Sequence, residues 1–154
     1  MTFWLEALGI GLVAGLRSLT APAAVSWAAW LTGLDLEGSP LAFMASKLAV
    51  VIFTLAALAE YVADLLPGTP NRTRPGPLIG RLVLGGFSGA CLAVAGRHPL
   101  VLGAILGGIG ALIGAFGGYE IRSRLVRRLN IRDAFVAIPE DLVAIVLAYL
   151  IVAR

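Results

Sequence analysis

The stretch that decides the fold runs from Leu78 to Gly118 and reads LIGRLVLGGFSGACLAVAGRHPLVLGAILGGIGALIGAFGG, in which Arg81 and Arg97 are the only formally charged residues. A second stretch, Ala134 to Ala153, contains two adjacent acids and no other charge. A helix needs about 20 mainly apolar residues to cross a bilayer, and these stretches approach or exceed that length. They predict an integral membrane protein.

The composition of the whole chain points the same way. Of 154 residues, 59% are hydrophobic and 14% are charged, and the mean hydropathy is +0.93, whereas soluble domains carry about 25% charged residues. We therefore expect one transmembrane domain over residues 1–154, built as an all-α, polytopic helical bundle of about five spanning segments. This length leaves no room for a separate catalytic domain, so we do not expect an enzyme.

Five apolar segments are candidates for these crossings, and the first and last contain helix-breaking signals. The first segment has 29 residues, which at about 1.5 Å per residue exceeds the hydrocarbon thickness by about half. It should tilt or break near Gly15 to Pro22, and a helix start is expected at Pro139 in the last segment. The segments are Phe3–Leu31, Leu41–Leu66, Leu78–Ala95, Pro99–Tyr119 and Ala134–Ala153.

Basic residues concentrate in two connections, Pro67–Pro77 and Arg122–Asp133. Cytoplasmic loops of membrane proteins carry an excess of Lys and Arg. Five crossings then place the N-terminus in the cytoplasm and the C-terminus outside, in a bacterial inner membrane.

The same basic residues predict the partners of the protein. Arginines beside spanning helices attract anionic lipid headgroups, and nucleic acid is not expected. A stripe of small residues from Gly103 to Gly117 predicts close helix packing, either within the chain or between copies in a homo-oligomer. The arginines expected to meet lipid headgroups are Arg72, Arg74, Arg122, Arg124, Arg127 and Arg128.

Arg17 is the first candidate for a functional residue, because a permanent charge inside an apolar segment is costly unless it is paired or hydrated. One interpretation is a structural ion pair or a side chain that reaches the interface. The other is an anion-binding group at a broken helix, assisted by backbone N–H groups after Ser18. The acids considered as its partners are Glu6, Glu60, Glu140 and Asp141.

Acidic residues supply the rest of the candidate site. Glu60 and Asp64 are four residues apart and share a helix face, Glu120 has a similar position in a later segment, and Glu140 with Asp141 forms a further pair. Such acids can take up a proton or a cation, or can neutralise arginines. Acids on three helices can converge into one cytoplasm-facing cavity, and the sequence alone does not decide whether they do. The pattern does not decide whether a metal ion binds, and it indicates no cofactor.

Three motifs carry a resemblance to a known family: the run Gly15-Leu16-Arg17-Ser18-Leu19-Thr20-Ala21-Pro22, the pair Glu60 and Asp64, and Gly80-Arg81 opening a glycine-rich helix. The chain resembles a family of small bacterial membrane proteins described as domain of unknown function 4126. The resemblance implies a polytopic membrane protein and supplies no activity and no catalytic residues.

The function expected from these features is translocation of a small solute, an ion or a lipid headgroup through a polar intramembrane site. The residues expected to contact the substrate are Arg17, Ser18, Glu60, Asp64, Glu120, Glu140 and Asp141. The alternative is a scaffold without transport, which binds anionic lipid or a protein partner through its basic loops.

Overall fold

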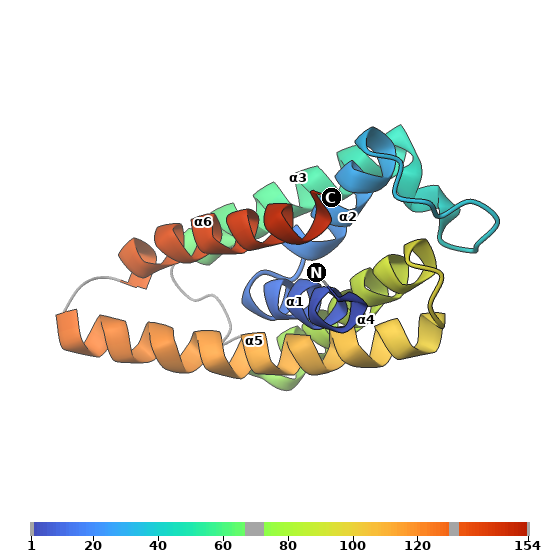
Figure 1. Cartoon of the computed structure of the whole chain (residues 1–154). Helices are drawn as coiled ribbons and strands as arrows, with labels where there is room; N and C mark the ends of the chain where they lie inside the picture. Colours follow the sequence, from blue (N-terminus) through green and yellow to red (C-terminus); the bar gives the residue numbers. More distant parts are fainter. Residues whose placement is uncertain (1, 67–72, 130–132, 154) are drawn as a thin grey trace.

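A computed structural model describes residues 2–66, 73–129 and 133–153 of the chain. Within these residues the structure is all-helical and contains no strand (Figure 1). This confirms the predicted all-α membrane bundle. In chain order the helices are α1 (Phe3–Leu16), α2 (Thr20–Leu31), the short 3-10 helix η1 (Ala42–Ala45), α3 (Lys47–Leu65), α4 (Pro75–Ala95), α5 (Leu100–Leu129) and α6 (Asp133–Val152).

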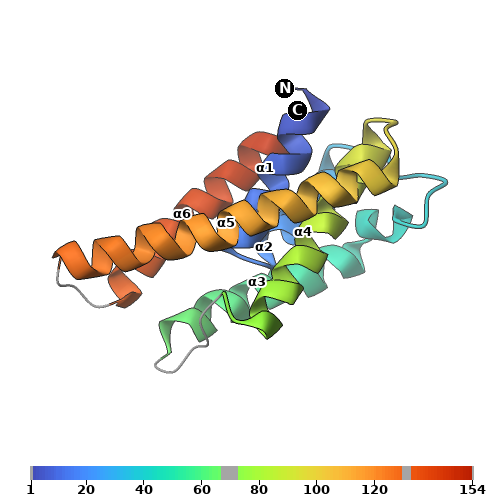
Figure 2. The same ribbon diagram turned by 90° about the horizontal axis from the view of Figure 1, so that it is seen from below.

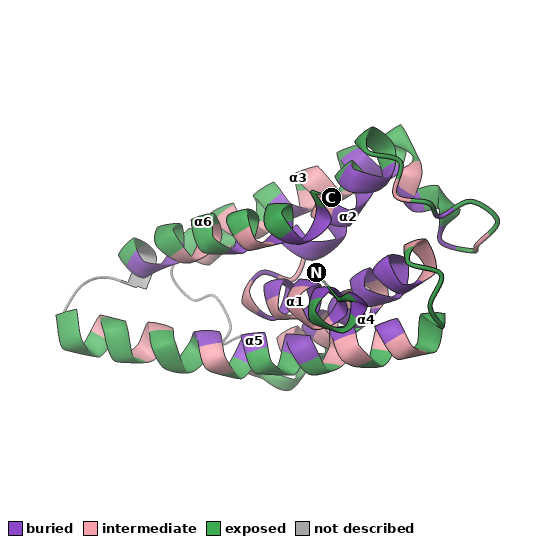
Figure 3. Ribbon diagram, in the orientation of Figure 1, coloured by how far each residue is buried: buried purple, intermediate pink, exposed green. Residues whose placement is uncertain are grey.

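Four helices, α3 to α6, are long and apolar enough to cross a membrane. Their outward faces carry exposed apolar side chains such as Leu48, Val62, Ile113 and Tyr149. Figure 3 shows exposed positions along α3, α5 and α6. Apolar side chains of this kind can face hydrocarbon. The backbone can also lie in hydrocarbon, because each helix satisfies its own backbone hydrogen bonds.

The first apolar segment, predicted to tilt or break, breaks into helices of 14 and 12 residues. Each is shorter than the roughly 20 residues that a crossing needs. α1 runs alongside α5 in the same direction, since Leu8 lies at Gly110 and Leu12 lies at Gly114. α2 instead runs antiparallel to α3, because Thr20 contacts Tyr61 and Trp27 contacts Thr54.

α3 and α5 point the same way, since each is antiparallel to α4. The residue pairs that fix these directions are Phe53 with Phe87 and Glu60 with Arg81 for α3, and Gly89 with Gly103 and Gly85 with Gly107 for α5. The chain therefore enters the bundle along α1, reverses at Arg17 to Leu19, and returns along α2. We refer to this pair of helices as the re-entrant hairpin.

The reversal places both ends of the chain together, as Figures 1 and 2 show. Phe3 stacks on His98 of the α4–α5 turn, with ring centroids 4.1 Å apart, and Gly9 packs against Ile151 near the end of α6. This arrangement differs from the five crossings expected from the sequence, which would put the two termini at opposite ends of the bundle. Judged by its length alone, the first segment would form one crossing. The break at Arg17 to Leu19 instead allows the chain to turn back.

Two helix boundaries also differ from the sequence expectation. α6 continues through Pro139, so Glu140 and Asp141 lie inside a helix and not at its start. Proline removes one hydrogen bond from a helix interior, a loss that packed membrane helices can accommodate. α5 extends to Leu129, so most of the connection expected after Arg122 is helical. Its arginines and leucines are strong helix formers.

The centre of the bundle consists of α1, α4 and α5, which touch through glycines. On α5, Gly103 and Gly107 face the backbone of α4, and Gly110 and Gly114 face the backbone of α1. A methyl group at any of these positions would overlap the facing helix. These contacts lie within one chain, and association into a homo-oligomer stays a prediction.

Candidate functional site

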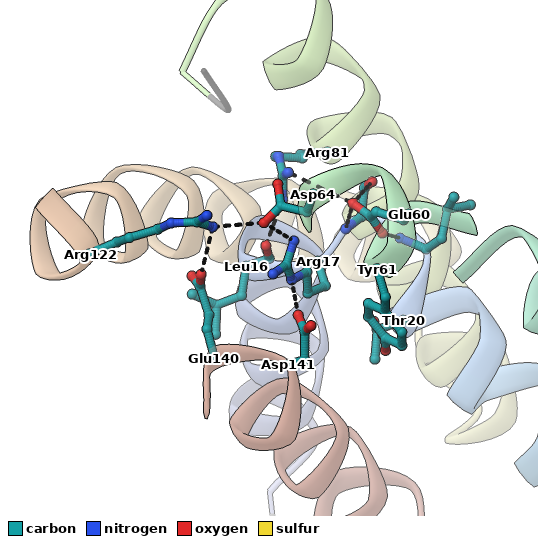
Figure 4. Close-up of polar contacts among 12 residues, drawn as sticks. Leu16, Arg17, Thr20, Glu60, Tyr61, Asp64, Arg81, Arg122, Glu140 and Asp141 are labelled. Carbon is teal, nitrogen blue, oxygen red and sulfur yellow. Dashed lines mark hydrogen bonds and ion pairs between the residues drawn. The ribbon is translucent and has the colours of Figure 1, made fainter. Parts of the chain in front are cut away.

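Seven charged side chains from five parts of the fold surround the break between α1 and α2 (Figure 4). Arg17 lies in the break itself, and the other six project from α3, α4, α5 and α6. We call this set the charge network; its members are Arg17, Glu60, Asp64, Arg81, Arg122, Glu140 and Asp141.

Arg17 is the centre of the charge network and has 0% of its surface exposed. Its Nη1 lies 2.6 Å from Oδ2 of Asp64, and its Nε forms an ion pair with Asp141. Its guanidinium carbon is 6.0 Å from the centre of the Tyr61 ring. Two carboxylates and an aromatic face thus compensate a cation that would otherwise be too costly to bury.

Glu60 of α3 holds the side of the break that leads into α2. Its carboxylate accepts hydrogen bonds from the backbone N–H groups of Ser18 and Leu19, both at 2.9 Å, and from the Ser18 hydroxyl at 2.6 Å. The N–H groups before a helix point along its positive end and attract anions. The acceptor that they find here is a carboxylate of the protein itself.

Arg81 of α4 holds the other side, at the end of α1. Its Nη1 donates to the carbonyl oxygens of Gly15 at 2.8 Å and Leu16 at 2.9 Å. These are among the last carbonyls of the helix, which have no partner within it and carry its negative end. Arg81 Nη2 also lies 3.7 Å from Glu60, so the two capping side chains are linked.

Arg122 of α5 joins the charge network to the remaining helices. Its Nη1 donates to Asp64 at 2.7 Å and to Glu140 of α6 at 3.3 Å. Asp64 therefore contacts both Arg17 and Arg122. One carboxylate of α3 connects the hairpin with α5, and through Arg122 with α6.

The charge network contains most of the residues singled out in the sequence. Arg17, Glu60, Asp64, Glu140 and Asp141 lie together, with Ser18 bound to Glu60. Glu120 is elsewhere: it pairs with Arg124 at 2.6 Å on an exposed part of α5.

Not every acid considered as a partner of Arg17 contacts it. Asp141 is paired with it, whereas Glu6 lies in the first turn of α1, eleven residues or about 16 Å away along the helix axis.

Sequence reasoning assigned no site role to Arg81, Arg122, Thr20 or Tyr61. Arg81 did give a signal, as one of two charges in a 41-residue apolar stretch. Arg122 gave none, because it begins a run of arginines that is typical of a cytoplasmic loop. The side chain of Arg122 is 11% exposed and bound to acids.

A cleft of about 400 Å³ lies beside the charge network, between α2, α3 and α6. It extends along α2 from Thr20 to Thr32 and along α6 from Ile145 to Ala153. Thr20 and Tyr61 share a hydrogen bond of 2.6 Å at the end nearest Arg17. No charged residue is among the described residues that line this α2–α3–α6 cleft.

The arginines expected to meet lipid headgroups fall into separate groups. Arg74, Arg124, Arg127 and Arg128 are exposed, whereas Arg122 belongs to the charge network. Arg72 lies outside the described residues.

Across the described ranges, no group of three or more His, Cys, Asp or Glu side chains is arranged to hold a metal ion. Comparisons with protein-family models, with curated proteins and with solved structures find no match for the chain.

Proposed function

We propose that the protein moves a small solute, an ion or a lipid headgroup across the bilayer, and that the charge network opens and closes the path. The observation that carries the proposal is the reversal of the chain at Arg17 inside an apolar bundle, surrounded by ionisable groups from α3 to α6. Charges at this depth are costly and usually mark transport pathways. Helices interrupted within the membrane are a common way to build such sites.

The ion pairs support the assignment of the structure to one state of the proposed path. Asp64 holds Arg17 and Arg122 at once, and Glu140 holds Arg122 from α6. These pairs join the hairpin, α3, α5 and α6 on one side of the α2–α3–α6 cleft. We assign this arrangement to a state closed at the charge network, and movement of α6 away from Asp64 would open it.

The sidedness of the protein follows from its arginines. The two ends of the bundle differ, because Phe3 and Val152 lie at one end, and Arg74 lies at the other with the arginines of the last turns of α5, which are Arg122, Arg124, Arg127 and Arg128. By the positive-inside rule the basic end is cytoplasmic. We therefore place both chain ends outside the cell, in a bacterial inner membrane.

The test measures flux in proteoliposomes with one probe for each substrate class. Pyranine reports protons, light scattering reports glycerol, and dithionite bleaching reports the movement of a fluorescent phospholipid. The protein should raise one of these rates above that of protein-free vesicles. Arg17→Lys keeps the positive charge and loses the planar, forked geometry of the guanidinium, so we expect it to lower the same rate at least several-fold.

Arg124→Lys is the matched control, because Arg124 has a 66% exposed side chain and pairs outside the charge network. Its flux should equal that of the unmodified protein, and gel filtration should give one monodisperse peak for both variants. If the rates for protons, glycerol and phospholipid all equal those of protein-free vesicles, transport of these three classes is refuted. Equal flux from Arg17→Lys and Arg124→Lys would remove Arg17 from the mechanism.

A second candidate function, a scaffold on anionic lipid, rests on the end of α5. Arg124, Arg127 and Arg128 are exposed there, and so are Ile121, Leu125 and Leu129. Basic and apolar side chains combined on one helix are typical of segments that bind the surface of anionic membranes.

The charge contribution of these arginines can be removed without touching the charge network. In the triple variant Arg124→Gln, Arg127→Gln and Arg128→Gln, less phosphatidylglycerol should remain bound in native mass spectrometry, while phosphatidylcholine should be unchanged. Unchanged retention of both lipids would refute this second candidate.

A further inference from the structure

We propose that the α2–α3–α6 cleft is an amphipathic site whose polar end lies beside the charge network, and that it takes the apolar chain and the uncharged polar head of a molecule such as a monoacylglycerol or a long-chain alcohol. The inference rests on the proposed function and names the class of molecule that is moved. Three features carry it: the walls of the cleft, its polar end and the charge balance beyond that end.

The walls of the cleft suit a hydrocarbon chain. Small side chains such as Ala24, Ala57 and Ala148 line it and leave the space open, with Trp27 and Tyr149 beside them. Its volume of about 400 Å³ falls within the roughly 300–1,000 Å³ of small-molecule sites, which are mainly apolar with a few polar groups. An apolar chain that moves from the bilayer into the cleft gains little free energy, because both environments are apolar. The polar end therefore decides which molecule binds.

The polar end of the cleft offers hydrogen bonds. Thr20 and Tyr61 both line the cleft, and their hydroxyl groups share one hydrogen bond. Each hydroxyl has further capacity as donor or acceptor. The Tyr61 ring lies over Arg17, so a head that reaches Tyr61 is next to the charge network.

Arg17 lies against the Tyr61 ring and is not among the residues that line the cleft. Its Nε and Nη1 form ion pairs, whereas within the described part of the chain Nη2 has no hydrogen-bond acceptor. The side chain is fully buried. Buried donors in native proteins are nearly always satisfied, by protein, water or ligand. Water or a ligand oxygen that reaches Arg17 would satisfy Nη2.

The charge balance selects an uncharged head. The charge network holds three guanidinium groups and four carboxylates, so its described members have no surplus positive charge with which to bind a phosphate. A hydroxyl or ester oxygen can bond to the Thr20 or Tyr61 hydroxyl group without adding a fifth negative charge beside the charge network. An uncharged amphiphile is therefore the occupant that fits both the cleft and its polar end.

Trp27 provides a direct reporter, because it lines the cleft. In the variant Trp4→Phe and Trp30→Phe, Trp27 is the only tryptophan of the chain. A monoacylglycerol with a dibrominated chain is added to this protein in lipid nanodiscs. We expect saturable quenching of Trp27 fluorescence, and at least tenfold weaker apparent binding by a lysophosphatidic acid with the same brominated chain.

Two substitutions in this background test where the chain lies. Ala24→Leu fills the cleft and should weaken monoacylglycerol binding at least tenfold. Ala59→Leu adds the same group at an exposed position of α3 that does not line the cleft, and should leave binding unchanged.

The polar end is tested by Thr20→Val combined with Tyr61→Phe, which removes both hydroxyl groups at nearly constant volume. We expect binding several-fold weaker than in the background protein. Quenching that rises linearly without saturation, or equal affinities for Ala24→Leu and Ala59→Leu, would overturn the inference. Equal binding of the phosphate amphiphile would overturn the choice of an uncharged head.

The outcome is separable from that of the proposed function. Absent binding together with flux of protons or glycerol would reject the amphiphile and leave transport standing. Saturable binding without any flux would reject transport and keep the site.

Discussion

Arg81 of α4 and Glu60 of α3 lie 3.7 Å apart and cap the two sides of the break in the re-entrant hairpin. Arg81 donates to the last carbonyls of α1, and Glu60 accepts from the N–H groups that lead into α2. Each charge therefore faces the helix end of opposite polarity. Two spanning helices hold in place a hairpin whose own helices are too short to cross.

The first prediction concerns Glu60. Glu60→Ala leaves the N–H groups of Ser18 and Leu19 without their acceptor, and each unsatisfied buried donor costs about 1–3 kcal/mol. The loss should appear as a lower midpoint of SDS-induced unfolding, followed by circular dichroism. Glu60→Gln keeps one acceptor oxygen and should lower the unfolding midpoint less than Glu60→Ala does. Glu120→Ala removes an exposed acid and should change the free energy by about 0.5 kcal/mol or less.

The second prediction concerns the pair of Arg17 and Asp141. Arg17→Met leaves two carboxylates without their shared cation, and removal of one partner of a buried ion pair costs about 3–5 kcal/mol. Asp141→Asn in the same chain removes one uncompensated charge and should recover part of this loss. The unfolding free energies of the two single variants and the double variant form a double-mutant cycle. Additive losses would mean that the two side chains do not interact.

The third prediction compares neighbouring glycines of α5. Gly107→Ala places a methyl group against the Gly85 carbonyl of α4, and overpacking of this kind costs about 1–3 kcal/mol. Gly108→Ala meets no described atom within 4 Å and replaces glycine with a better helix former. Thermal unfolding in detergent should therefore show a lower midpoint for Gly107→Ala alone. Equal midpoints would contradict the close approach of α4 and α5.

The fourth prediction concerns the reversal of the first segment. In a Cys91→Ala background, single cysteines at Thr2, Ser39 and Ala153 should all react with a membrane-impermeant maleimide from the same side of the membrane. A cysteine at Arg128 should react from the other side. Five crossings would instead put Thr2 and Ala153 on opposite sides, so labelling of whole cells and inverted vesicles separates the two topologies.

Part of the candidate site was predictable because some signals are local. A charge such as Arg17 in an apolar segment is visible in the sequence, and so is the sequence from Gly15 to Pro22 that breaks the helix there. Arg122 was assigned to lipid because its neighbours are arginines. Its contact with Asp64 joins residues 58 positions apart, and no local pattern encodes that distance.

The sequence by itself determined that the chain is a helical membrane protein whose first segment must tilt or break near Gly15 to Pro22, because burial in hydrocarbon and helix breaking depend on the residues of each stretch. The tertiary structure decided that the chain turns back at Arg17, that both ends meet, and which acid neutralises which arginine. These outcomes depend on how α1 fits the glycines of α5 and on which helices bring their charges to the break. Such contacts join distant parts of the chain, and they exist only once the bundle has packed.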